Sequence, residues 1–67
     1  MAYRLGIDVG GTFTDYVLQD EQSGELIAAK HPTRPSDLAG GILEGLSEVL
    51  GGIGIDLQQI SQAIHAT

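Results

Sequence analysis

The 67-residue sequence predicts an α/β fold, in which an antiparallel meander of three strands precedes an amphipathic helix and a short second helix. Near the N-terminus, apolar residues alternate with polar or small residues, which is typical of strands. From residue 38 onward they recur at spacings of three and four, which is typical of a helix. The connections between the expected strands are short, and short connections favour antiparallel neighbours.

The first expected strand covers residues 3–9, with its apolar side chains on one face and Asp8 on the other. The second, residues 13–18, is rich in β-branched and aromatic residues and ends at the polar segment 19–24. The third covers residues 25–31. It is ended by two prolines, because proline cannot donate a hydrogen bond to a neighbouring strand.

The expected helix begins at Ser36, whose hydroxyl can cap the free N–H groups while Asp37 lies at the positive end of the helix dipole. Gly41 and Gly45 each weaken a helix by about 1 kcal/mol relative to alanine, so their presence indicates close packing against a neighbour. Three glycines are expected to end the helix: Gly51, Gly52 and Gly54.

Beyond these glycines, Asp56 and Gln59 have the spacing of a capping box, which predicts the start of the short second helix. Its apolar positions are Leu57, Ile60 and Ile64. His31, beside Pro32, is expected to be a surface residue at a strand end rather than a ligand.

The composition narrows the classes of partner. The formal net charge is −6, and the three basic residues are scattered along the chain, which disfavours nucleic acid and anionic membranes. No cysteine is present, which fits a reducing compartment, and no segment approaches the apolar length of a membrane span. A cytoplasmic protein is therefore expected.

The segment DVGGTFTD, residues 8–15, carries the chemistry. A P-loop requires a lysine and a serine or threonine after its last glycine, and a dinucleotide fingerprint requires a third glycine and a following helix. Here two glycines lead from one expected strand directly into another, so both readings are excluded by context. The remaining interpretation is a β-hairpin whose tip contacts phosphate.

In such a tip, Gly10 and Gly11 allow unusual backbone angles and close approach of a phosphate, while Thr12 and Thr14 offer hydroxyl donors. Asp8 would hold a magnesium-bound water or position a nucleophile. A plain Gly-Gly hairpin turn is the alternative, and the acid and the two threonines around the turn favour the phosphate site. Asp15 has three open roles: it supports the loop, faces the ligand or is a solvated strand residue.

The segment RLGIDVGGTFTDYVLQD, residues 4–20, closely resembles the start of the hydantoinase A / 5-oxoprolinase family, which includes the β-subunit of acetone carboxylase. The likeness continues more loosely through residues 42–46. The last residues, 64–67, are similar to a His-Gly-Thr-Thr segment of the family, with Ala66 where glycine is usual.

This resemblance implies a ribonuclease H-like nucleotide-binding fold, shared with sugar kinases, actin and Hsp70 chaperones. It implies ATP and Mg²⁺ as cofactors, with Asp8 for metal binding or catalysis and the hairpin tip for phosphate. The implied activity is ATP-dependent opening of a cyclic amide, or carboxylation of a ketone, through phosphorylation of the substrate carbonyl.

Family members are much longer, so residues 1–67 are expected to be the N-terminal part of a nucleotide-binding domain that is inactive alone. In the resembled fold, the far edge of the first strand pairs with a strand that would begin near Ile64. We expect that edge to be open here, which favours self-association or pairing with the rest of the protein or another subunit. The alternative function is a small interaction domain that keeps the hairpin as a structural turn.

Overall fold

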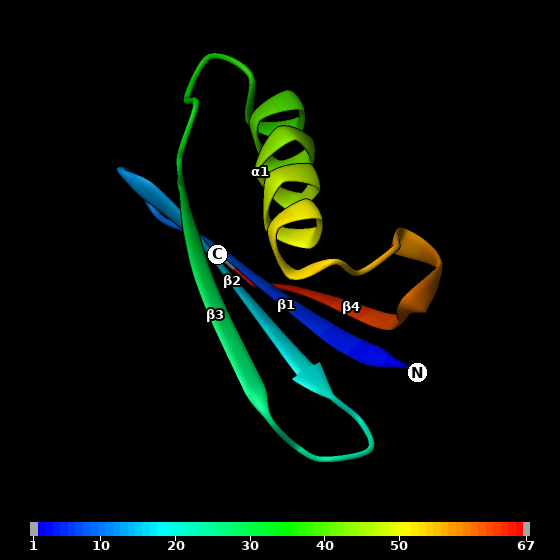
Figure 1. Cartoon of the computed structure of the whole chain (residues 1–67). Coiled ribbons are helices and arrows are strands. Elements are labelled where there is room, and N and C mark those ends of the chain that lie inside the picture. The colour runs from blue at the N-terminus through cyan, green and yellow to red at the C-terminus, as the bar shows by residue number, and fades with distance from the viewer. Residues whose placement is uncertain (1, 67) are drawn as a thin grey trace.

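The computed structural model describes residues 2–66, and the side chains of residues 2–64. Four strands form one sheet in the order β3-β2-β1-β4, and helix α1 covers one of its faces (Figure 1). The elements along the chain are β1 (Tyr3–Val9), β2 (Phe13–Asp20), β3 (Leu26–Pro32), α1 (Leu38–Ile53), the 3₁₀ helix η1 (Leu57–Gln59) and β4 (Ile60–Ala66). We call the face without α1 the open face.

The predicted antiparallel meander is confirmed. β1 pairs with β2 from Tyr3 opposite Asp20 to Val9 opposite Thr14, and β2 continues into an antiparallel pair with β3. Between β2 and β3, the carboxylate of Asp20 accepts a hydrogen bond from the N–H of Gln22 at 2.8 Å, and Gly24 has a φ of 77°. A left-handed turn residue of this kind favours glycine, as the polar segment suggested.

The predicted second helix is only the single turn η1, and the assignment of Ile60 and Ile64 to that helix is wrong. Both residues belong to β4, which runs parallel to β1. A spacing of four residues fits one helical turn but also two repeats of a strand, so periodicity alone did not distinguish them. The capping box itself is present, with the N–H of Asp56 donating to Gln59 Oε1 at 2.8 Å.

β4 also corrects the expected open edge. The strand begins at Ile60 rather than near Ile64 and covers the far side of β1, so β1 is internal to the sheet. The outer edges belong to β3 and β4.

Helix α1 is capped one residue later than predicted. Its N-cap is Asp37, whose carboxylate accepts a hydrogen bond from the N–H of Gly40 at 3.1 Å. Its C-cap is Gly54, with a φ of 85° and an N–H that donates to the carbonyl of Leu50. Gly51 and Gly52, expected to end the helix, lie within its last turn.

The core lies between α1 and the sheet. Tyr16 is fully buried there, and its hydroxyl donates to the carbonyl of Ile42 at 2.8 Å. Burial also raises the pKa of Tyr16, because the ionised form loses its hydration. The six buried apolar residues of this core are Leu5, Tyr16, Leu18, Leu46, Leu50 and Ile55.

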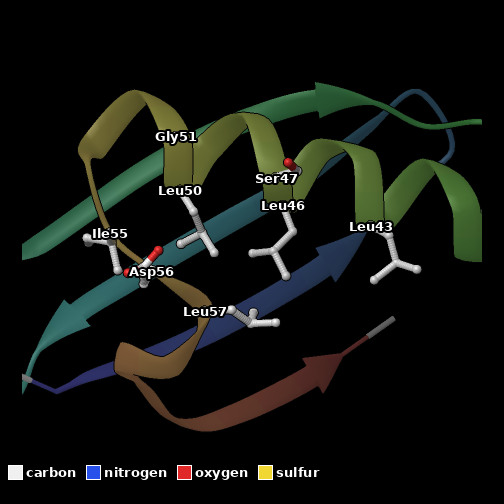
Figure 2. A pocket seen from close by; sticks show the side chains of 8 residues that line it. All are labelled: Leu43, Leu46, Ser47, Leu50, Gly51, Ile55, Asp56 and Leu57. Carbon is white, nitrogen blue, oxygen red and sulfur yellow. The ribbon is translucent and has the colours of Figure 1, made fainter.

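An apolar groove of about 350 Å³ lies between α1 and η1. Figure 2 shows Leu46 and Leu50 projecting from α1 toward the strands, with Leu57 of η1 on the other side of the groove. Leu43 and Leu57 remain well exposed at its rim. No helix in the described part of the chain has the length and hydropathy needed to cross a bilayer.

Gly45 lies at a close contact between α1 and the sheet, which confirms the close packing predicted for it. A Cβ at this position would overlap the Tyr16 hydroxyl and would lie 2.9 Å from His31 Cβ. The His31 side chain is only 15% exposed, and its Nδ1 is 2.7 Å from Glu48 Oε2 of α1. His31 is therefore part of the contact between strand and helix, rather than the surface residue that was expected.

We expect Gly45→Ala to lower the free energy of unfolding by about 1–2 kcal/mol, because the cost of overlap exceeds the gain of about 1 kcal/mol in helix propensity. The matched control is Gly51→Ala in the same helix, where an added Cβ meets nothing within 4 Å. The control is expected to be neutral or stabilising. Urea unfolding of the chain measures both, and equal effects would contradict the packing described here.

The raised pKa of Tyr16 predicts a loss of stability at alkaline pH. The tyrosine of the unfolded chain ionises near its ordinary pKa of 10.0, below that of the folded chain. The contribution of Tyr16 to stability is therefore complete below about pH 10 and is lost as the pH rises from there toward the folded-state pKa. Thermal unfolding from pH 8 to 11 should show this decline, and Tyr16→Phe should flatten it while costing about 1 kcal/mol at neutral pH.

Candidate functional site

The tip of the β1–β2 hairpin consists of Gly10, Gly11 and Thr12, all exposed. The N–H of Gly10 donates to the carbonyl of Phe13 at 3.0 Å. A Cβ on Gly10 would lie 2.8 Å from that same carbonyl oxygen, whereas a Cβ on Gly11 would meet nothing within 4 Å. Neither glycine has a positive φ, so neither is required for a left-handed backbone. The two positions differ instead in their surroundings, which are closely packed at Gly10 and open at Gly11.

Two acids border this tip on the open face. Asp8 of β1 lies directly opposite Asp15 of β2, and the next residue along this row is Lys30 of β3. Lys30 Nζ is 4.0 Å from Asp15 Oδ1; the Lys30 side chain is 70% exposed and that of Asp15 45%. Asp8 makes no ion pair with any described residue. The two carboxylates therefore form an acidic pair, hereafter the Asp8–Asp15 pair, of which only one member has a basic neighbour.

Beside the Asp8–Asp15 pair is a shallow apolar depression of about 260 Å³. Val17 and Ile64 line it, and both are exposed on the open face. Among the described residues, no group of three or more acidic, histidine or cysteine side chains is placed to hold a metal ion. Any metal at the pair would therefore take its remaining ligands from water or from a bound molecule.

Thr14 lies on the opposite side of the sheet from the Asp8–Asp15 pair. It is 2% exposed, on the same side of β2 as Tyr16, and its Oγ1 is 3.0 Å from Thr33 Oγ1. Thr12 is exposed at the tip. The structure therefore brings Asp8 and Asp15 together beside the tip and places the Thr14 hydroxyl on the opposite face of the sheet, against Thr33.

Thr33, in the connection between β3 and α1, was not identified from the sequence. Its hydroxyl donates to the carbonyl of Gly10 at 2.9 Å, and its N–H donates to the carbonyl of Thr12 at 2.9 Å. The two prolines around it predicted only a strand end. Nothing in the local sequence indicates a contact with a hairpin more than twenty residues earlier.

This arrangement suits a phosphate with a divalent cation. No described residue accepts a hydrogen bond from the N–H of Gly11 or of Thr12, so both are available as donors to anionic oxygens. Carboxylate oxygens are ligands that Mg²⁺ prefers, and Mg²⁺ is often bound by one or two carboxylates together with substrate phosphates. The donors and the acids present here fit such a group.

Residues 4–67 match the hydantoinase/oxoprolinase N-terminal region. The chain belongs to this family. The resemblance found in residues 4–20 is thereby confirmed and extends to the C-terminal residues. The Ala66 and Thr67 positions of the similar terminal segment lie outside the residues whose side chains are described.

Two relatives illustrate the range of the family. The chain is 46% identical over 52 residues to caprolactamase subunit alpha of Pseudomonas jessenii. This match covers 78% of this chain and 7% of that protein. It is also 41% identical over 56 residues to the acetophenone carboxylase gamma subunit of Aromatoleum aromaticum. That match covers 84% of this chain and 7% of that protein. The chain thus spans less than a tenth of the length of these relatives.

Among solved structures, the chain is similar to diol dehydratase-reactivating factor in its nucleotide-free form. The TM-score is 0.73 at 32% identity, and the match covers 97% of this chain and 12% of that one. The predicted fold class is confirmed: the chain has the α/β, ribonuclease H-like unit of actin-like ATPases, with the additional strand β4.

The two glycines of the tip are expected to respond differently to substitution. Gly10→Ala should lower the free energy of unfolding by about 1–2 kcal/mol, because the added methyl group overlaps a backbone oxygen that is held in a hydrogen bond. Gly11→Ala should change it by less than about 0.5 kcal/mol, as is usual at open surface positions. Urea unfolding of both variants tests this, and a Gly11→Ala loss as large as that of Gly10→Ala would contradict the geometry of the tip.

Proposed function

We propose that residues 1–67 form the N-terminal part of a nucleotide-binding domain in an ATP-dependent hydrolase of cyclic amides. The observation that carries this proposal is the position of the Asp8–Asp15 pair beside a hairpin tip whose backbone N–H groups, at Gly11 and Thr12, donate to no described residue. The substrate class is supported by the likeness to a caprolactamase subunit, since a lactam is a cyclic amide. ATP would supply the phosphoryl group that activates the carbonyl of the amide.

In this proposal, Asp8 and Asp15 would hold Mg²⁺ through their ionised carboxylates, and Asp8 would also position the nucleophile. Gly11 and Thr12 donate N–H groups to the phosphates, and Gly10 gives the tip its tight shape. Thr14 supports the tip from beneath, through Thr33. These roles keep every residue that the sequence predicted for the site, but divide them between direct contact and support.

Electrostatics make the cation necessary. The chain has a formal net charge of −6, and the Asp8–Asp15 pair would repel the phosphates of a nucleotide. Lys30 is the basic group nearest the pair, at 4.0 Å from Asp15, and exposed pairs of this kind contribute little. Mg²⁺ held by the carboxylates of Asp8 and Asp15 would offset this repulsion and so allow the phosphates to bind.

A second candidate function is the ATP-dependent carboxylation of a ketone, which the likeness to the acetophenone carboxylase gamma subunit favours. Both candidates use the hairpin in the same way and differ only in the substrate. Both relatives are named as subunits, so we propose that the protein carrying this chain acts together with other subunits. It is expected to be cytoplasmic.

The test is Asp8→Asn in the full-length protein that carries this chain. We expect ATP-dependent turnover to fall on the order of 100-fold or more, because the amide keeps the shape of the side chain but removes the charge that holds the cation. The matched control is Glu25→Gln, an exposed acid at the opposite end of the sheet, between β2 and β3. Its turnover should be unchanged.

Undiminished turnover in Asp8→Asn would remove the role given to Asp8. Direct titration with Mg-ATP distinguishes the nucleotide-binding function from the alternative of a small interaction domain. An interaction domain that keeps the hairpin as a plain turn would leave the unsubstituted full-length protein without Mg-ATP affinity.

A further inference from the structure

Thr33 holds the hairpin tip from outside the hairpin through three hydrogen bonds. They join its hydroxyl to the carbonyl of Gly10, its N–H to the carbonyl of Thr12, and its Oγ1 to that of Thr14. We propose that Thr33 is a positioning residue of the phosphate site, which aims the N–H of Gly11 toward the side of the Asp8–Asp15 pair. This proposal rests on the nucleotide-binding function proposed above.

The two threonine hydroxyls form a chain with one direction. A hydroxyl has a single proton to donate. Since Thr33 gives its proton to the carbonyl of Gly10, the 3.0 Å bond between the two hydroxyls uses the proton of Thr14. The hydrogen bonds run from Thr14 to Thr33 to Gly10, and each strengthens the next. Thr14 is buried and its proton is already used, so it influences a phosphate only through Thr33.

The planar peptide between Gly10 and Gly11 links the hydrogen bond of Thr33 to the orientation of the Gly11 N–H. In a trans peptide the C=O of one residue and the N–H of the next point in opposite directions. No described peptide bond is cis. The carbonyl of Gly10 points toward Thr33, which contacts Thr14 on the side of the sheet covered by α1. The N–H of Gly11 therefore points away from Thr33, and so away from the side of the sheet that α1 covers.

Without the contacts of Thr33, few interactions would fix the orientation of the peptide between Gly10 and Gly11. It lies between two glycines, the residues with the greatest backbone freedom, and the space around Gly11 is open. A donor that is already aimed loses less entropy when a ligand binds. Thr33 thus contributes preorganisation of a donor that it does not itself supply.

The experiment uses the full-length protein with Thr33→Val, which keeps the shape and the N–H but removes the hydroxyl, and Thr33→Ser, which keeps both donors. Thr33→Val is expected to weaken Mg-ATP binding by about tenfold, the effect of one hydrogen bond, and to raise KM for ATP without changing KM for the organic substrate. Thr33→Ser should bind within about twofold of the unsubstituted protein. Glu25→Gln again serves as the unaffected control.

A second variant, Thr14→Val, tests the hydroxyl chain. It should weaken Mg-ATP binding less than Thr33→Val does, because the bond from Thr33 to Gly10 remains. A larger loss in Thr14→Val than in Thr33→Val would mean that Thr14 contacts the ligand directly, and would overturn the chain of hydrogen bonds.

The outcomes separate this proposal from the function on which it rests. Normal Mg-ATP affinity in Thr33→Val, with weakened binding in Asp8→Asn, would overturn the role of Thr33 and leave the nucleotide site intact. Absence of Mg-ATP binding by the unsubstituted protein would overturn both. If Thr33→Val lowers the unfolding midpoint, Thr33→Ala and Thr33→Ser are compared at a temperature where both are folded, and equal affinities would overturn the role of the hydroxyl.

Discussion

The contact of Tyr16 with α1 is the constraint on which the rest of the structure depends. Its side chain is fully buried and occupies the space that a side chain at Gly45 would need. Its hydroxyl must also reach the carbonyl of Ile42, which fixes the position of α1 along β2 as well as its distance from the sheet. Leu46 and Leu50, one and two turns further along the helix, then complete the core.

The same strand that carries this contact also carries the site. Successive side chains of a strand point to opposite faces, so a shift of one residue in β2 would bury Asp15 and expose Tyr16. Burial of Thr14, Tyr16 and Leu18 on one side therefore keeps Asp15 opposite Asp8 on the open face. The position of the acidic pair is a direct consequence of the register of the core.

The acidic pair has an electrostatic cost and no packing role that offsets it. Like charges directly opposite each other in an antiparallel pair are destabilising, and the exposed Lys30 compensates only one member. Natural proteins break such local rules chiefly at functional sites. The pair also lies next to the N–H groups of Gly11 and Thr12, for which no described residue is an acceptor. A bound cation would relieve the repulsion between the acids, and the oxygens of a phosphate bound with it would accept hydrogen bonds from these N–H groups.

The sequence by itself determined the elements that local patterns encode. Alternation predicted the three strands, spacings of three and four predicted α1, and the failure of the P-loop and dinucleotide patterns left a hairpin with Asp8 and Asp15 beside its tip. Local patterns were less reliable at boundaries, where Asp37 rather than Ser36 caps α1 because its carboxylate reaches the N–H of Gly40.

Only the tertiary structure decided what depends on partners distant in the chain. The spacing of Ile60 and Ile64 fits a helix or a strand equally well. Their segment is a strand because it pairs with the edge of β1 that β2 does not cover. The residues around Thr33 do not predict its contacts, because its partners Gly10 and Thr12 lie in a hairpin more than twenty residues nearer the N-terminus. Hydrogen bonds between distant segments depend on how the chain folds back on itself, and neither periodicity nor composition predicts this.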